Sequence, residues 1–313
     1  MDIRNRRELK AAADRSLKNA AYDPKKLVLI YTGVTLAVSL LSLVLDYFLD
    51  QQISGTGGLS GVGTRTILET VQSLATSLQL LVLPFWQYGW IYTTLQLYRG
   101  EQVGPASLLR GFRKFGPVLR LMLLGFAVYY AACLVMIIVV MALVFAMAAG
   151  AVMSSADRIA AGTDEQIMSQ VMNGVWPVVI IACVVICVVM TFFSYRLRLI
   201  FFCVMDHPEE GTVAAIKNSW VLTKRNVFAL FKLDLSFWWF ALLDVLVAAI
   251  LYLGMILPVL GVELPVSAEM GYFGAFALYA VCQLALYWWR KDYVDVTYAA
   301  AYDALREPEE RQI

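Results

Sequence analysis

The sequence is poor in charged residues, and this shortage excludes several classes of protein. Only 16% of the residues are charged and 60% are hydrophobic, whereas about 25% are charged in soluble domains. The 25 basic and 24 acidic residues give a net charge of +1 without a long basic tract. We therefore expect no nucleic-acid binding. The composition predicts a membrane protein.

Histidine and cysteine are also scarce, which argues against metal chemistry. His207 is the one histidine, so a site with several histidine ligands is excluded. The five cysteines all lie inside apolar runs, and we interpret them as small buried hydrophobes. Cys183 and Cys187 share a helix face, but no second pair supplies further ligands. The sequence therefore predicts neither a metal nor a cofactor.

The motifs of common enzymes are missing as well. There is no zinc-protease motif, no phosphate-binding glycine loop that leads to a lysine, and no nucleophile with a histidine base. The first 26 residues are basic and lack an apolar core, so we expect no cleaved signal peptide. These absences predict a protein without enzymatic activity.

Long apolar runs dominate what is present. A transmembrane helix needs about 20 mostly apolar residues. Six runs qualify: Leu27–Leu49, Ile67–Tyr98, Pro117–Met153, Pro177–Met205, Val227–Leu260 and Tyr272–Trp289. The sequence thus predicts an all-α polytopic bundle of six transmembrane helices over 27–289, a basic amphipathic N-terminal helix within 1–26, and a tail over 290–313. We expect the long third and fifth runs to tilt or project from the bilayer, and eight crossings are the alternative.

The distribution of Lys and Arg predicts the orientation of this bundle. With both termini inside, 23 of the 25 basic residues lie on the inner face, and only Arg65 and Arg158 lie outside. Short basic loops stay in the cytoplasm. The outer segments 51–64, 154–173 and 261–271 are too short for an extracellular catalytic domain. We expect a multi-pass protein of the bacterial cytoplasmic membrane with cytoplasmic termini.

Short amphipathic helices are predicted on the cytoplasmic side. Asp206 and Glu209 fit a capping box, followed by apolar residues at helical spacing as far as Trp220, in a helix over about 208–223. The loop from Pro105 repeats this pattern weakly, which leaves open a duplicated unit. We expect the N-terminal helix to bind anionic headgroups, with anchoring favoured over lipid sensing.

Asp244, in the fifth apolar run, is the first candidate for function, because a charge inside a bilayer is costly. It is either a proton- or cation-coupling site or a neutral carboxyl that hydrogen-bonds a neighbouring helix through a group such as Gln87 or Tyr279. We favour the second, because no basic partner lies near it in the sequence.

Asp234 is a second candidate, with Arg196 and Arg198 as its expected partners. Two residues apart on a helix corresponds to about 200° of rotation, so one arginine is expected to face the bundle and the other to reach headgroups. We favour contact between helices over catalysis. Pro84 and Gly89 interrupt the second run, where a kink either lines a cavity or serves packing.

Six segments resemble, in order, a bacterial membrane family catalogued as domain of unknown function 975. They are Arg7–Lys18, Gly111–Gly116, Asp206–Glu209, Ala215–Trp220, Leu235–Trp239 and Tyr298–Leu305. Two features depart from the family pattern. The family tends to be uncharged at the position of Asp234, and the segment 150–173 is enlarged here. The resemblance implies a polytopic membrane protein with no assigned reaction. The chain is also distantly similar to the membrane portions of some glycerophosphodiester phosphodiesterases, without their catalytic domain.

The preferred interpretation is a non-enzymatic accessory or envelope-homeostasis factor that binds membrane lipids, and that has a membrane-protein partner or forms a homo-oligomer. The alternative is a small transporter or exporter of an amphiphilic substrate that uses the Asp244 region. An intramembrane enzyme is third. A wide polar cavity would favour the transporter, and a filled bundle the accessory factor.

Overall fold

The computed structural model describes residues 3, 5–55, 62–154, 164–252 and 268–310. Within these ranges the chain forms eleven α-helices, two 3-10 segments and no strand. The predicted all-α class is therefore confirmed for the described part of the chain. Parts of the predicted outer segments and the end of the fifth run, at 56–61, 155–163 and 253–267, lie outside the described residues.

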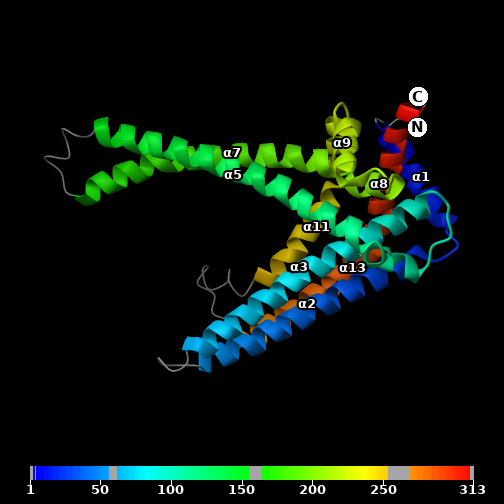
Figure 1. The fold of residues 1–313 in the computed structure, drawn as a ribbon, viewed down its shortest axis with the longest axis horizontal. Helices are drawn as coiled ribbons and strands as arrows, with labels where there is room; N and C mark the ends of the chain where they lie inside the picture. The colour runs from blue at the N-terminus through cyan, green and yellow to red at the C-terminus, as the bar shows by residue number, and fades with distance from the viewer. Residues whose placement is uncertain (1–2, 4, 56–61, 155–163, 253–267, 311–313) are drawn as a thin grey trace.

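Five long helices form two arms (Figure 1). The first arm contains α2 (Pro24–Gly55), α3 (Val62–Tyr98) and the N-terminal part of α13 (Ala268–Glu310), which pack side by side. The second arm is the pair of α5 (Phe115–Ser154) and α7 (Asp164–Leu197). The arms diverge from one end of the molecule, so their far ends lie apart (Figure 1).

The region where the arms meet is called the head. There α1 (Arg6–Lys18) packs against the C-terminal half of α13. The head also contains η2 (Pro105–Leu109), α4 (Arg110–Arg113), α8 (Ile200–Asp206), α9 (Gly211–Thr223) and α10 (Val227–Leu235).

Much of the buried core lies in the head, and α13 supplies a large part of it. Six of its residues are at most 1% exposed: Val296, Thr297, Ala299, Ala300, Ala301 and Tyr302. The small alanines let neighbouring helices approach closely, and the Tyr302 ring stacks on Phe202 with centroids 5.0 Å apart. The segment expected as a tail after residue 289 is therefore helical to Glu310 and carries core.

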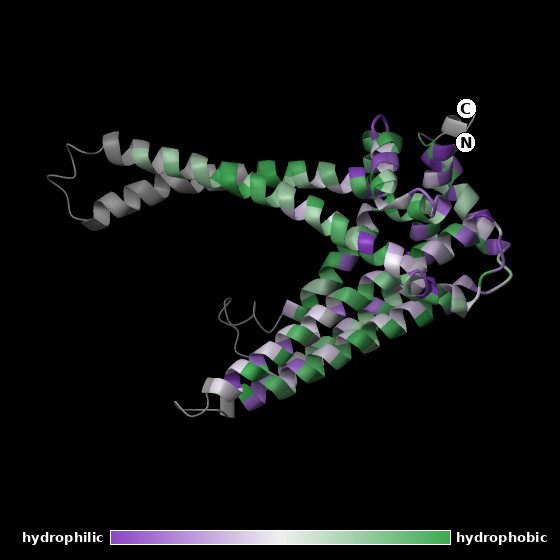
Figure 2. Cartoon of the chain, in the orientation of Figure 1, coloured by the Kyte–Doolittle hydropathy of each residue, from purple (hydrophilic) through white to green (hydrophobic). Residues whose placement is uncertain are grey.

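Three helical segments are long and apolar enough to cross a membrane: Pro24–Ile53, Phe115–Ala142 and Cys183–Asp206. A fourth is formed by α10 with α11 (Trp238–Ala249) and η3 (Ile250–Tyr252), if this bent pair counts as one span. Figure 2 shows hydrophobic residues dominating α5 and α7, while hydrophilic residues gather in the head. The chain thus has the helices of a membrane protein, and the count of six crossings stays a prediction.

The fifth predicted run is broken into two helices. α10 ends at Leu235 and α11 begins at Trp238, with a bend of 67° between them. Ser236 Oγ donates to the Leu233 carbonyl at 2.6 Å, and Lys10 Nζ of α1 donates to the Ser236 carbonyl at 3.3 Å. These donors satisfy carbonyls that the next helical turn would otherwise satisfy. The prediction of one tilted or projecting helix over this run is therefore wrong.

The N-terminal helix packs its apolar face on protein. Leu9 and Ala13 are fully buried, and Ser16 Oγ donates to the Tyr98 carbonyl at 3.1 Å. The expected contact with anionic headgroups stays a prediction for the basic residues on the opposite face. What the structure adds is that α1 also closes the core of the head.

The segment after α3 folds back onto that helix at two glycines. A Cβ added to Gly89 would clash with the Leu108 carbonyl, and one added to Gly111 would clash with the Phe85 carbonyl. Backbones this close require glycine. Gly89 therefore serves packing, which is one of the two interpretations given for the interrupted second run. Pro84 instead lines the cavity described next.

Candidate functional site

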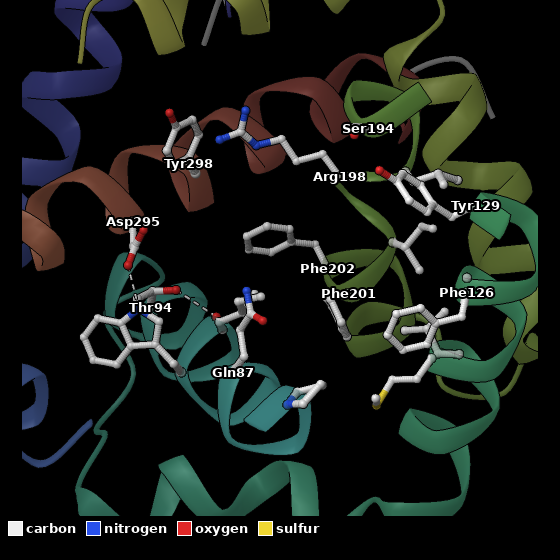
Figure 3. A pocket seen from close by; sticks show the side chains of 18 of the residues that line it. Gln87, Thr94, Phe126, Tyr129, Ser194, Arg198, Phe201, Phe202, Asp295 and Tyr298 are labelled. Atoms are coloured by element: carbon white, nitrogen blue, oxygen red, sulfur yellow. Dashed lines mark hydrogen bonds between the residues drawn. The ribbon is translucent and has the colours of Figure 1, made fainter. Parts of the chain in front are cut away.

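A cavity of about 630 Å³ lies where the two arms meet the head (Figure 3). This volume is within the range of about 300–1,000 Å³ that is typical of small-molecule sites. Helices α3, α5 and α13 line it, together with Tyr31 of α2 and the segment from Ser194 to Phe202, which contains the end of α7 and the start of α8. We call this cavity the junction pocket.

The α5 side of the junction pocket is apolar. Leu121, Met122 and Phe126 line it, and Gly125 leaves space between them because it has no side chain. Phe126 is 50% exposed, so its ring is available to a ligand. Phe201, across the cavity in Figure 3, extends this surface. The wall suits a hydrocarbon group.

One polar part of the pocket is an ion pair held among aromatic rings. Lys291 Nζ lies 3.0 Å from Asp295 Oδ2, one turn further along α13. It also lies 4.6, 5.5 and 5.9 Å from the ring centroids of Tyr287, Tyr31 and Trp90, where cation–π attraction operates. Trp90 Nε1 donates to the same carboxylate oxygen at 2.6 Å. Burial alone lowers the pKa of Lys291, but Asp295 and then Tyr287 outweigh it and raise the pKa, so the ammonium stays charged.

The second polar part centres on Arg198, which Figure 3 shows beside Tyr298. Arg198 Nη1 lies 2.5 Å from Asp234 Oδ2. Tyr195 and Tyr298 each donate a hydroxyl to the same carboxylate at 2.5 Å. The Arg198 guanidinium also lies 4.1 Å from the centroid of the Tyr298 ring. The structure thus brings Asp234 together with one of the two arginines expected as its partners.

Arg196 has a different position. It is 8% exposed, and its guanidinium donates to the carbonyls of Trp220 and Lys224 at 3.3 and 3.5 Å. These bonds hold α9 against α7. Arg198 lies beyond the end of α7 at Leu197, so the rotation of about 200° expected for two residues of one helix does not apply. The expectation that one of these arginines reaches headgroups is wrong for Arg196.

A further charged cluster ties α3 to α8 and α13. Arg99 donates to both oxygens of Asp206, at 2.7 and 2.9 Å, and pairs with Asp303 at 2.6 Å. Arg306 and Tyr302 reach the same Asp206 carboxylate at 2.6 and 2.9 Å. The hydrogen bonds to Asp206 and then to Asp303 raise the pKa of Arg99 above its ordinary value. Three donors from two other helices therefore share the Asp206 carboxylate.

This cluster overturns the capping role predicted for Asp206. Asp206 is the last residue of α8, and α9 begins at Gly211 without a side-chain cap. Glu209 lies exposed in the turn between the two helices. The capping box is wrong because the Asp206 carboxylate is bound by donors such as Arg99 instead. Trp220 lies in α9 as predicted and is 36% exposed.

Asp244 lies outside the junction pocket, between α11 and α13. Gln283 Nε2 donates to Asp244 Oδ1 at 2.9 Å. Gln283 is only 5% exposed. The partners named from the sequence, Gln87 and Tyr279, are therefore corrected to Gln283. Gln87 instead lines the junction pocket. The choice of partner depends on the register of α13 against α11, which local sequence does not specify.

Comparison with known proteins places the chain in a family. The family model described as "Protein of unknown function (DUF975)" matches residues 1–309. The chain belongs to the DUF975 family. The resemblance inferred from the sequence is thus confirmed, and the match covers the whole junction pocket of this DUF975 protein. No curated protein and no solved structure shows significant similarity to it, and the resemblance to glycerophosphodiester phosphodiesterases is not shown.

Sequence reasoning missed the residues that α13 contributes to the site of this DUF975 protein. Lys291, Asp295, Tyr298 and Tyr302 recur every three or four residues, in a stretch without glycine or proline before Pro308. That spacing is typical of one face of a helix. This spacing indicates a helix with one functional face, whereas the position of the stretch after the last apolar run favours a tail.

Proposed function

We propose that this DUF975 protein binds a membrane lipid in the junction pocket and acts, without enzymatic activity, as an accessory factor in bacterial envelope homeostasis. The two-sided chemistry of the pocket carries the proposal. An apolar wall from α5 faces a polar wall that contains Lys291, Asp295 and Arg198. An amphiphile with an acyl chain and a charged headgroup matches both walls.

The surface beside the pocket supports entry of a lipid from the bilayer. The apolar wall continues along α5, where Leu123 and Tyr130 are 60% and 68% exposed. This part of α5 belongs to the candidate span Phe115–Ala142. A lipid chain along α5 stays in the hydrocarbon layer while its headgroup enters the pocket. Binding therefore does not transfer an acyl chain into water, which would be unfavourable.

In this proposal the head lies on the cytoplasmic side and the six apolar runs cross the bilayer, with α10 and α11 as one bent crossing. This orientation is supported by the basic residues, because it puts 23 of the 25 on the inner side of the membrane. Exposed aromatic residues on the head, including Phe112 and Trp220, suit the membrane interface. The ion pairs of the pocket then lie near the headgroups of the inner leaflet. A membrane-protein partner or a second copy of the chain stays a further expectation.

The alternative is a small exporter of an amphiphilic substrate, and the contacts of Asp244 give it less support. This carboxyl is held by Gln283 and does not line the junction pocket. A coupling carboxyl must exchange protons along a wet path. The lipid-binding function therefore rests on the pocket, whereas the transport function rests on Asp244 alone.

Filling the pocket tests the proposal. Gly125→Leu is suited to this, because a Cβ at Gly125 meets no atom within 4 Å and the added side chain enters the pocket. Gly116→Leu is the matched control, since this glycine also lies on α5 with no atom within 4 Å but does not line the pocket. Each protein is purified in mild detergent, and its bound phospholipid is measured by native mass spectrometry.

We expect Gly125→Leu to lose most of the phospholipid that the wild type and Gly116→Leu retain. Thermal unfolding of all three proteins checks that they are folded. Equal retention of phospholipid by three folded proteins would refute lipid binding at this pocket.

A further inference from the structure

We infer that the lipid of the junction pocket is a zwitterionic phospholipid with a primary ammonium group, of the phosphoethanolamine kind. The inference rests on the proposed lipid-binding function and adds the class of headgroup. It follows from how each ion pair faces the cavity. Arg198 lines the pocket and its partner Asp234 does not, whereas Asp295 and Lys291 both line it and Asp295 is the more exposed of the two.

Arg198 provides the cationic side. Its side chain is 32% exposed, and its contact with Asp234 uses Nη1. A guanidinium has five N–H donors in a planar arrangement. The remaining donors can bind phosphate oxygens, which match the guanidinium in a bidentate manner. Tyr195 and Tyr298 fix the Asp234 carboxylate behind the arginine, so Arg198 is held in place before a ligand arrives.

Asp295 provides the anionic side. Its side chain is 25% exposed, against 15% for Lys291, which lies among three aromatic rings. Lys291 and Trp90 both contact Asp295 Oδ2. Among the described residues Oδ1 has no hydrogen-bond donor, and a carboxylate oxygen can accept more than one. A primary ammonium in the pocket can donate to this oxygen.

The two sides together select against other headgroups. Each ion pair is neutral, and the more exposed member, which we call its edge, is the cation Arg198 in one pair and the anion Asp295 in the other. A phosphoglycerol headgroup satisfies Arg198 but brings its negative charge near Asp295 without compensation. Diacylglycerol leaves both edges unpaired. Only a headgroup with both charges pairs each edge with an opposite charge.

The test is a competition between two lipids with identical acyl chains. Purified wild-type protein is mixed with equal amounts of palmitoyl-oleoyl phosphatidylethanolamine and phosphatidylglycerol, and retained lipid is measured by native mass spectrometry. We expect about a tenfold preference for phosphatidylethanolamine, which corresponds to about 1.4 kcal/mol. A single hydrogen bond to a charged group has this magnitude.

Asp295→Asn should reverse the preference, because it removes the anionic edge and leaves the Lys291 charge without its carboxylate. Asp292→Asn is the matched control. Asp292 also lies on α13 and pairs with a lysine, Lys25, at 2.8 Å, but it does not line the pocket. We expect it to keep the wild-type preference. Arg198→Lys, which retains a charge beside Asp234 but loses the planar donors, should lower retention of both phospholipids.

The outcomes separate this inference from the function on which it rests. Equal retention of the two phospholipids by the wild type would overturn the headgroup class and leave lipid binding intact. If the wild type retained neither phospholipid better than diacylglycerol, the proposed function itself would be overturned. Unchanged selectivity in folded Asp295→Asn protein would overturn the role of Asp295.

Discussion

Arg99 and Asp206, 107 residues apart in the sequence, form a two-pronged ion pair with N–O distances of 2.7 and 2.9 Å. Arg99 follows α3 of the first arm, and Asp206 ends α8, which continues from the second arm. The pair therefore connects the two arms inside the head. Asp303 and Arg306 of α13 bind the same two side chains, so the connection includes the C-terminal helix.

Asp206→Asn should destabilise the protein by about 3 kcal/mol, because it removes the negative charge that Arg99 and Arg306 share, on a carboxylate that is only 6% exposed. Thermal unfolding in detergent measures the loss. Glu69→Gln is the control, since it breaks the exposed pair of Arg65 and Glu69 and should cost less than about 0.5 kcal/mol. Equal losses in the two variants would show that the Arg99 cluster contributes no more than a surface pair.

Tyr302→Phe should change how stability depends on pH. Burial, followed by electrostatic interaction with Cys203 and with the negative charge of Asp206, raises the pKa of Tyr302 above its ordinary value. A group with a raised folded-state pKa stabilises the fold below its unfolded pKa of about 10, and this contribution is lost as pH rises further. The wild type should therefore lose stability more steeply than Tyr302→Phe above about pH 10. If the wild type and Tyr302→Phe lost equal amounts of stability as the pH rose across this range, the prediction would be contradicted.

Gly89→Ala should destabilise the head, because the added Cβ clashes with the backbone carbonyl of Leu108. Overpacking of this kind typically costs about 1–3 kcal/mol. Gly33→Ala, in α2 with no atom within 4 Å of its added Cβ, is the control and should be neutral or stabilising, because alanine favours helix. Both are measured by thermal unfolding, and a silent Gly89→Ala would rule out the close approach of η2 to α3.

Asp244→Asn should be nearly silent, because asparagine keeps the oxygen that accepts from Gln283. Asp244→Leu removes the acceptor and should cost about 0.6 kcal/mol, and rarely more than about 1.7 kcal/mol, as for hydrogen bonds between helices in membranes. Unfolding in detergent compares the two. A stable Asp244→Asn protein that loses a proton-dependent activity in vesicles with a pH gradient would instead promote the transporter.

The orientation in the membrane is tested by labelling single cysteines in a variant that lacks the five native ones. Thr64 lies exposed at the start of α3, and Val213 is 71% exposed in α9. An impermeant maleimide should label Thr64→Cys in intact cells, and should label Val213→Cys only after the membrane is permeabilised. Labelling of Val213→Cys in intact cells would place the head outside.

The parts of the fold that depend on local pattern were predictable from sequence. The apolar runs predicted helices at the positions of α2 and α5, and the Ala- and Leu-rich N-terminus predicted a helix where α1 lies. These segments need only composition and helical spacing, which a single sequence contains. Asp234 could also be assigned an arginine partner, because a charge at a membrane edge requires compensation.

The parts that depend on distant contacts were not predictable. Asp206 fits a capping box by spacing, but its partner Arg99 lies 107 residues earlier in the chain. Lys10 donates to the Ser236 carbonyl at the end of α10, and no local pattern connects these two residues. The junction pocket combines residues of α2, α3, α5 and α13 with the end of α7 and the start of α8, so its existence depends on how these separate helices pack.

One feature of α13 links the membrane to the head. It is an uninterrupted helix of 43 residues, about 65 Å long at 1.5 Å per residue. Gln283 in its apolar half bonds Asp244, and Asp303 near its end bonds Arg99. A continuous helix transmits tilt along its length, and helices tilt when hydrocarbon thickness changes. With the proposed crossing of the bilayer by residues 272–289, we therefore expect a thinner or thicker membrane to change the tilt of α13 and, through it, the geometry of the Arg99 ion pairs.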